Sequence, residues 1–269
     1  FIFGGRFPSH LLGDYIYEKD TKSKYIQNNQ LKDIQSAFEI SLNKISVNNH
    51  IILIYPIPEV DVNVPRKLLN LLPKKVKDTK DYLDSINVNV PSLDKDIESL
   101  FIDNNWQYTI TKEREVNGEE IITKIKNIDC DYVVFAGYGG QILSKEHFLQ
   151  GKKYIHCHPG WLPLERGSTT LYYSLLNERD LSVTSFFMTE KIDEGNMLLR
   201  ESYKAPKKLI NIDVWIDNAL RADTLFKSIE LLSEKFIGFS RKEEEEDQEY
   251  YVIHPLLKHI ALLSLINLK

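Results

Sequence analysis

The chain contains very little cysteine. Only Cys130 and Cys157 occur among its 269 residues, and two cysteines in a chain of this length do not form a disulfide framework. The sequence also shows no signal peptide and no apolar run long enough to span a bilayer, because its most apolar segment, 253–268, is short and carries Lys258 and two histidines. These absences favour a protein of the reducing cytoplasm without a membrane partner. The segment 253–268 is instead expected to form an amphipathic or buried helix.

An excess of positive charge is absent too. Lysine and arginine together number 34 against 39 aspartates and glutamates, which gives a formal net charge of −5. A nucleic-acid partner usually calls for a basic face, and none is evident, so we expect no nucleic acid among the partners. The apolar share of 42% and the charged share of 27% are typical of a globular chain that buries a core. The length allows one large domain or two small ones.

The sequence does contain an alternation of strand-like and helix-like segments. Short apolar runs predict strands, and apolar residues at helical spacing predict helices. The alternation predicts an α/β fold with a mainly parallel sheet and flanking helices. Residues 71–95 are rich in Lys, Asp, Asn and Pro with little periodicity, and we predict a junction there. The predicted strands are 1–3, 50–55, 106–110, 131–136, 154–158, 182–188 and 197–203, and the predicted helices are 29–45, 119–128, 144–149, 168–177 and 212–234.

Two histidines lie at the end of the predicted strand 154–158, which continues into Pro-Gly. Residues two apart in a strand share a face, so His156 and His158 project together, while Cys157 points the other way as a core thiol. Ligands of α/β proteins collect at the carboxyl ends of strands, so the pair lies where a site is expected. A purely structural histidine pair is one alternative, and a His-x-His zinc site with a carboxylate is another.

Two further segments add polar groups. Gly167, Ser168 and Thr169 open the predicted helix 168–177, where free backbone N–H groups would hold an anion or a carbonyl oxygen. The segment Thr-Glu-Lys-Ile-Asp-Glu-Gly that ends at residue 195 follows a predicted strand and has the composition of a tight turn. It would present Asp193 or Glu194 from a neighbouring strand end.

With these residues in view, the sequence resembles a known family. The block from His156 to Gly167 is similar to the motif Asn-x-His-x-Ser-x-Leu-Pro-x-x-Arg-Gly, and Asp193-Glu-Gly is similar to the Asp-x-Gly turn that follows it. Both motifs mark the formyltransferases that use 10-formyltetrahydrofolate and act on glycinamide ribonucleotide, methionyl-tRNA or nucleotide-linked amino sugars. The sequences Arg-Gly-Ser-Thr-Thr and Ile-Asp-Glu-Gly are most similar to the corresponding motifs of the sugar formyltransferases of surface-polysaccharide pathways.

The resemblance covers about the second half of the chain and implies an N-formyltransferase. The donor would be 10-formyltetrahydrofolate, the acceptor the amine of a small-molecule amino sugar, and no metal is implied. The resemblance assigns catalytic roles to His158, Asp193 and His156. The residues implied in folate binding are Phe135, Gly137, Tyr138, Gly139, Gly140, Ile142, Leu143, Glu194 and Gly195, and those implied in substrate binding are Arg166, Gly167, Ser168 and Thr169.

The chemistry of formyl transfer explains these residue types. An oxyanion develops when the amine attacks the formyl carbon, and a donor aimed at it typically stabilises the transition state by about 3 to 4 kcal/mol. We expect His158 to be that donor and Asp193 to accept the amine proton or to hold the imidazole. His156 departs from the family, whose asparagine at this position helps to bind the formyl oxygen. A histidine can still donate one hydrogen bond, but a less active or inactive site is the alternative.

The N-terminal part does not resemble the usual start of a formyltransferase. The segments 3–8, 52–60 and 64–66 instead resemble the SGNH-like domain attached to membrane acyltransferases that acetylate polysaccharides. No Gly-Asp-Ser block and no Asp-x-x-His block occur in the chain, so the serine and histidine of an acyl-transfer nucleophile are missing. We therefore expect a partial SGNH-like segment at 1–95 and a formyltransferase-like catalytic domain at 96–269.

Three hypotheses follow. The first is a sugar-amine formyltransferase. The second is a non-catalytic fusion or remnant of a formyltransferase and an SGNH-type polysaccharide O-acyltransferase. The third is an SGNH-type acyltransferase or esterase component whose serine lies upstream, since the chain begins at Phe1 inside a predicted strand and we expect further residues before it. Folate binding separates the first hypothesis from the other two. The sequence does not name the acceptor sugar or the oligomeric state.

Overall fold

The structure is a computed structural model, and every structural statement below concerns the residues that it describes. These are residues 2–5, 52–55, 72–88, 97–111, 113, 115–137, 141–177, 179–208, 210, 212–233 and 248–267. The predicted helix 29–45 and most of the segments that resemble an SGNH-like domain lie outside them, so both stay predictions.

The chain divides into two compact units. Unit 1 comprises Phe1–Leu71 and Asn89–Ile155, and unit 2 comprises Leu72–Val88 and His156–Lys269. This division describes compactness and does not test the expected change of family at residue 95. Strand β5 (Lys153–His158) is divided between the units, with its first half in unit 1 and its histidines in unit 2.

Unit 1 is built on parallel strands in the order β3-β2-β1-β4-β5. Phe3 of β1 lies opposite Leu53 of β2 on one side and Val134 of β4 on the other. Val134 is buried, as an apolar run in a parallel sheet requires. The strands are β1 (Ile2–Gly5), β2 (Ile52–Tyr55), β3 (Gln107–Ile110) and β4 (Tyr132–Ala136), and the helices are α5 (Ile97–Asp103), α6 (Glu119–Asn127) and α7 (Lys145–Phe148).

Unit 2 continues from β5 into an antiparallel pair, in the order β5-β7-β8. The sheet is therefore mixed, and the predicted mainly parallel sheet is confirmed apart from this pair. Its other elements are α4 (Leu72–Ser85), β6 (Arg166–Gly167), α8 (Thr170–Leu176), β7 (Leu181–Phe187), β8 (Met197–Tyr203), the π-helical turn η1 (Ile212–Ile216), α9 (Asp217–Ser233), β9 (Glu249–Tyr250) and α10 (Pro255–Asn267).

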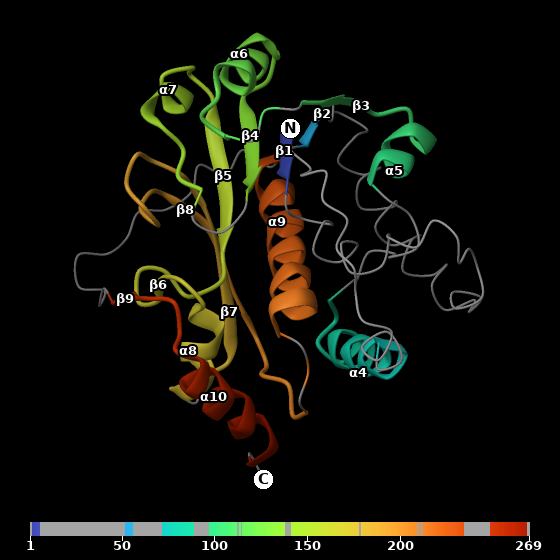
Figure 1. Cartoon of the computed structure of the whole chain (residues 1–269), viewed down its shortest axis with the longest axis vertical. Helices are drawn as coiled ribbons and strands as arrows, with labels where there is room; N and C mark the ends of the chain where they lie inside the picture. The colour runs from blue at the N-terminus through green and yellow to red at the C-terminus, as the bar shows by residue number, and fades with distance from the viewer. Residues whose placement is uncertain are drawn as a thin grey trace. The chain divides into compact units, whose positions relative to one another are not determined.

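The core of unit 2 lies where α9 packs on β7 and β8, which Figure 1 shows as the orange helix beside these two strands. Strand β7 is buried along almost its whole length, because one face meets α9 and the other meets the loop after β5. Leu181 and Val183 are fully covered. Helix α10 packs on α8 and buries Ala261 and Leu265, as predicted for the apolar segment near the end of the chain. None of the described helices is long and apolar enough to cross a membrane.

The predicted junction at 71–95 is wrong over its first part, where α4 forms a helix of unit 2. Among residues 78–85 of α4, whose burial the structure describes, Thr79, Tyr82 and Leu83 are buried. The Tyr82 hydroxyl donates to the backbone oxygen of Lys204 at 2.8 Å, a contact far away in the sequence. The segment is rich in lysine and aspartate, and this composition obscures the helical period when only apolar spacing is considered.

Candidate active site

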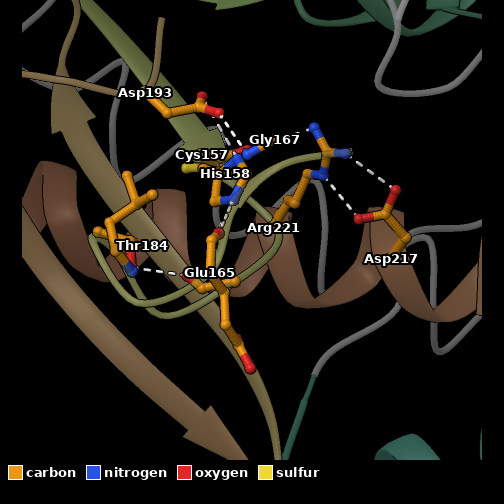
Figure 2. Close-up of polar contacts among 10 residues, drawn as sticks. Cys157, His158, Glu165, Gly167, Thr184, Asp193, Asp217 and Arg221 are labelled. Carbon is orange, nitrogen blue, oxygen red and sulfur yellow. Dashed lines mark hydrogen bonds and ion pairs between the residues drawn. The ribbon is translucent and has the colours of Figure 1, made fainter. Parts of the chain in front are cut away.

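The site is centred on His158, the last residue of β5. Its side chain is 3% exposed, and Figure 2 shows its ring between Glu165 and Asp193. The ring Nε2 lies 2.6 Å from the backbone oxygen of Glu165, and Nδ1 lies 3.4 Å from Oδ1 of Asp193. The predicted approach of Asp193 to His158 is therefore present as a direct contact, with no need for a bridging water.

Both ring nitrogens of His158 face oxygens that accept hydrogen bonds. A backbone carbonyl oxygen can only accept, so Nε2 is the donor in its contact with Glu165. The second ring nitrogen faces a carboxylate oxygen, which also only accepts when ionised. The surroundings therefore hold the ring by its two nitrogens, one against Glu165 and one against Asp193.

Asp193 is presented by the turn between β7 and β8. Its φ of 53° lies in the left-handed region, which aspartate tolerates better than most residues. Oδ2 accepts the backbone N–H of Gly167 at 3.0 Å while Oδ1 faces His158. Burial raises the pKa of Asp193, but the hydrogen bond and charge of His158, the Gly167 N–H and the charge of His156 outweigh burial and lower the pKa to about 2. The carboxylate is thus ionised at any physiological pH.

The same turn depends on Gly195, whose φ is 144°. A Cβ built there would lie 1.9 Å from the backbone oxygen of Phe187, a contact that no side chain can make without moving β7 or the turn. The Thr189 hydroxyl also closes the turn by donating to the oxygen of Glu194 at 3.1 Å. The close approach of the turn to β7 therefore sets where Asp193 is presented.

We expect Gly195→Ala to cost about 1 to 3 kcal/mol in free energy of unfolding, because it forces a strained backbone and a steric clash at once. Gly151→Ala is the matched control, since Gly151 also has a positive φ, of 74°, but a Cβ added to it would have no atom within 4 Å. Urea unfolding of the two variants measures the difference. Equal losses would show that the approach to Phe187 is not tight.

His156 lies on the same strand as His158, and its ring is half-buried. It packs edge-on against Phe186 of β7, with ring centroids 6.0 Å apart and planes at 83°. Its charge also contributes to the lowered pKa of Asp193, as the smallest of the causes. The two histidines and Asp193 thus act on one another electrostatically, as the shared strand face predicts.

The expected substrate segment is occupied by contacts of the protein itself. The N–H of Gly167 donates to Asp193, and that of Ser168 donates to the oxygen of Tyr250 at 2.9 Å. The Thr169 hydroxyl donates to the oxygen of Ser168 at 2.7 Å and accepts the N–H of Ile253. The prediction of free backbone donors is therefore wrong for Gly167 and Ser168, because sequence alone does not show that Asp193 and β9 reach them.

Arg166, in the same segment, extends toward the Asp193 turn. Its Nη1 lies 3.7 Å from Oε1 of Glu194, a half-exposed ion pair. Strand β6, which carries Arg166 and Gly167, pairs with β9. The segment implied in substrate binding is thus held between the Asp193 turn and the C-terminal part of unit 2.

The residues implied in folate binding that precede β5 belong to unit 1. Phe135 is half-buried near the end of β4, Leu143 is buried and Ile142 is 55% exposed. A Cβ at Gly137 would lie 2.4 Å from Cζ of Phe135, so the Phe135 ring lies against the backbone of Gly137. Tyr138, Gly139 and Gly140 lie outside the described residues.

Several contact residues of the site were not singled out from the sequence. Glu165 and Thr184 hold the loop after β5, and Arg221 of α9 donates to the backbone oxygen of Cys157 at 3.3 Å while forming a bidentate ion pair with Asp217 (Figure 2). Glu165 carries a weak sequence signal, as an acidic residue inside the Leu-Pro-x-x-Arg-Gly motif. Thr184 and Arg221 carry none, since their roles depend on contacts far away in the sequence.

Cys157 is a buried thiol, as predicted from its place between the two histidines. Burial raises its pKa to about 12, only partly offset by the charge of Arg221. A thiol with so high a pKa is not a nucleophile at neutral pH. Among the described residues, no three His, Cys, Asp or Glu side chains are grouped as metal ligands.

A histidine beside an ionised carboxylate at the end of a strand is an arrangement typical of the active sites of α/β enzymes. The sequence says which one. The formyl transferase family model matches residues 35–209, more than half of the chain, and the chain belongs to this family of enzymes. The family uses formyltetrahydrofolate as the formyl donor. The acid and donor chemistry around His158 fits transfer of such a group.

Individual relatives agree with this family. The chain is 31% identical over 132 residues to the methionyl-tRNA formyltransferase of Bacillus velezensis, a match that covers 48% of this chain and 38% of that protein. It is 30% identical over 146 residues to the enzyme of the same name from Clostridium beijerinckii, covering 53% and 46%. The matched part thus spans less than half the length of these curated relatives.

The fold is shared with a solved structure. Phosphoribosylglycinamide formyltransferase from Bacillus halodurans superimposes with a TM-score of 0.50 at 11% identity, covering 87% of this chain and 96% of that one. A sugar N-formyltransferase from a Shewanella species gives a TM-score of 0.46 at 20% identity, covering 80% and 87%. At these identities the likeness concerns the fold alone. The SGNH-like character expected for the N-terminal part is not found by these comparisons.

Proposed function

We propose that the chain is an N-formyltransferase that moves a formyl group from 10-formyltetrahydrofolate to the amine of an amino sugar, one carried on a nucleotide and used for surface polysaccharides. The observation that carries the proposal is the contact of His158 with the ionised carboxylate of Asp193 at the end of β5. His156, the folate-loop residues and the segment from Arg166 to Thr169 keep the roles that the resemblance implies. A cytoplasmic location is part of the same proposal.

The roles of the two central residues follow from their contacts. The bound folate supplies an activated formyl group and is itself the leaving group. An N–H of His158 donates to the oxyanion that forms on the formyl carbon, which requires Nε2 to share or release its contact with Glu165. A carboxylate with a pKa of about 2 is a weak base. Asp193 therefore orients the imidazole and stabilises positive charge on it, and the amine proton passes through water to the nitrogen of the departing folate.

Two acceptor classes compete for the same site. The curated relatives named above are methionyl-tRNA formyltransferases, which makes methionyl-tRNA the second candidate acceptor. The net charge of −5 favours the amino sugar, because a protein that binds transfer RNA neutralises phosphates with a basic face. The Arg-Gly-Ser-Thr-Thr sequence, which resembles that of the sugar formyltransferases, also favours the amino sugar as acceptor.

The test incubates the purified chain with 10-formyltetrahydrofolate and, in separate reactions, with a panel of nucleotide-linked amino sugars or with methionyl-tRNA. Release of tetrahydrofolate and the mass of the formamide product are followed. We expect an amino sugar to be formylated and methionyl-tRNA to remain unchanged. Formylation of methionyl-tRNA alone would establish the second candidate. If no acceptor reacts and folate does not bind, the non-catalytic remnant is the better description.

His156→Asn restores the amide that the family carries at this strand position. We expect kcat/KM to be kept or raised, because the smaller amide still donates to the formyl oxygen. The variant loses the edge-on contact with Phe186, so the free energy of unfolding should fall by about 0.5 to 1.5 kcal/mol. Steady-state kinetics and urea unfolding measure the two effects. Transfer by His156→Asn but not by the parent would mean that the chain is a decayed enzyme.

The lowered pKa of Asp193 predicts a pH dependence of stability. A carboxyl group whose folded pKa lies below its unfolded value stabilises the protein above the unfolded pKa, and this contribution disappears as the pH falls through the folded pKa. We expect the parent to exceed Asp193→Asn by about 2 kcal/mol in free energy of unfolding near neutral pH, with the difference vanishing between about pH 4 and pH 2. Urea unfolding at a series of pH values tests this. A difference that begins to fall at pH 6 would contradict the assigned pKa.

A further inference from the structure

Glu165 is a buried carboxylate whose oxygens are surrounded by donors. The residue is 1% exposed. Oε2 accepts the N–H of Trp161 at 2.9 Å and the hydroxyl of Ser182 at 3.0 Å, while Oε1 accepts the hydroxyl of Ser174 at 2.8 Å and lies 3.6 Å from Nη1 of Arg179. Burying a carboxylate is costly unless its oxygens are paired in this way. Four groups from the loop, β7, α8 and the segment after α8 therefore converge on a single side chain.

The backbone of Glu165 is engaged just as fully. Its N–H donates to the oxygen of Trp161 at 2.9 Å, so the turn between these two residues is closed by both the main chain and the side chain of Glu165. Its carbonyl oxygen accepts Nε2 of His158 at 2.6 Å. Thr184 of β7 supports the same turn, since its hydroxyl donates to the oxygen of Gly160 and accepts the N–H of Leu162. The carboxylate and the carbonyl oxygen of Glu165 thus link β7 and α8 to the ring of His158.

The turn leaves little room for His158 to move. A Cβ at Gly160 would lie 2.9 Å from Nε2 of His158 and 2.7 Å from the oxygen of Glu165. Any displacement of the turn therefore moves the Nε2 partner directly. The contact of Nδ1 with Asp193 is longer, at 3.4 Å, so the shorter contact to Glu165 is the one that fixes the ring plane.

We propose that Glu165 is the positioning residue of the active site. Its buried carboxylate holds the turn whose carbonyl oxygen orients the imidazole of His158 toward Asp193. This inference rests on the proposed formyl transfer for its kinetic consequence, but the orientation of His158 can be measured without any turnover.

The kinetic test compares Glu165→Ala with Glu165→Gln. Removing the carboxylate frees the turn, and a misplaced reacting group costs on the order of 100-fold in rate, so kcat of Glu165→Ala should fall about 100-fold with KM nearly unchanged. The fall in kcat should be smaller for Glu165→Gln, on the order of 10-fold. Its amide oxygen can still accept from Trp161 and Ser182, and its NH2 can turn to Ser174, whose hydroxyl has the oxygen of Thr170 at 3.1 Å as a second acceptor.

The matched control is Asp223→Asn. Asp223 belongs to another partly buried network of unit 2, where it accepts the hydroxyl of Tyr203 at 2.8 Å and pairs with Lys227. This variant should lose stability but keep kcat per folded molecule. A purely structural role for Glu165 predicts that the two sites behave alike.

The second readout is the ring proton of His158, observed by NMR and assigned with His158→Ala. In the parent its Nε2 proton should exchange slowly with water, because it is buried against Glu165. Glu165→Ala should abolish or shift this signal, while the ring signals of His147, a buried histidine of unit 1, should stay unchanged.

An unchanged His158 signal together with unchanged kcat in Glu165→Ala would overturn the positioning role. If the parent transfers no formyl group but the His158 signal moves as expected, the proposed function fails and the positioning of His158 by Glu165 stands. If Glu165→Ala does not fold, Glu165→Gln and Ser182→Ala carry the same two measurements.

Discussion

Asp193→Asn is expected to lower kcat about 100- to 10,000-fold, because His158 loses the carboxylate that orients its ring and stabilises charge on it. The carboxylate serves two donors at once, the Gly167 N–H at 3.0 Å and Nδ1 of His158 at 3.4 Å. An amide has only one oxygen, so its NH2 group must face one of these donors. Either the turn or the imidazole then loses its partner, and the negative charge that stabilises a protonated ring is removed.

Asp223→Asn is again the matched control, because the side chains of Asp193 and Asp223 are each 11% exposed. It should change stability by a similar amount without changing the rate per folded molecule. Initial rates at saturating folate and acceptor, divided by the folded fraction from urea unfolding, give the comparison. Equal rates for Asp193→Asn and the parent would remove Asp193 from the mechanism.

His158→Ala is expected to cost roughly 100- to 1,000-fold in turnover, as the loss of a principal oxyanion donor does elsewhere. The effect should appear in kcat, since the donor acts on charge that develops only in the transition state. The variant also removes the hydrogen bond to the backbone oxygen of Glu165, at 2.6 Å, and the contact with the carboxylate of Asp193. Some loss of stability is therefore expected as well.

His147→Ala separates the kinetic effect from the structural one. His147 is fully buried, and its ring nitrogens contact the hydroxyl of Tyr154 and the backbone oxygen of Val116. Removing it should destabilise the protein about as much but leave the rate per folded molecule unchanged. His158→Asn adds a second variant that keeps one donor. If a folded His158→Ala forms the formamide as fast as the parent, the mechanism proposed for His158 is wrong.

Much of the fold follows from local pattern. The apolar runs of β4 and β5 and the helical period of α6 lie within a residue or two of the predicted bounds. In α6 the buried residues Ile121 and Ile125 are one turn apart, and acidic residues begin the helix while lysines end it, so propensity and packing agree. Such elements are predictable because neighbours in sequence determine them.

The missed features share a different cause. Helix α4 is rich in lysine and aspartate, so its composition marks it as a junction. The N–H groups of Gly167 and Ser168 look free until the Asp193 turn and β9 are in place. Glu165 looks like a surface acid until Ser174 and Ser182 surround it. In each case a contact far away in the sequence decides the outcome, and no local period reports it.

The candidate site shows the same division. Strand alternation places His156 and His158 together, and the linked motifs bring in Asp193, whose contact with His158 the structure contains. The roles of these residues in catalysis remain predictions for the kinetic tests above. Arg221 could not be found from sequence, because its contact with the carbonyl of Cys157 depends on how α9 packs.

The pairing of β6 with β9 limits where the chain can be truncated or recombined without disturbing the Asp193 turn. The N–H of Gly167 holds Asp193, and a Cβ added to Gly167 would lie 2.1 Å from the oxygen of Tyr250, so the two backbones are in direct contact. Thr169 is tied to Ile253 by a hydrogen bond in the same region. A truncation, insertion or domain exchange that removes the segment after residue 247 would release the loop that holds Asp193, although Asp193 and both histidines would remain in the chain. A recombinant protein that preserves this site must therefore retain residues 248–253 together with the two histidines.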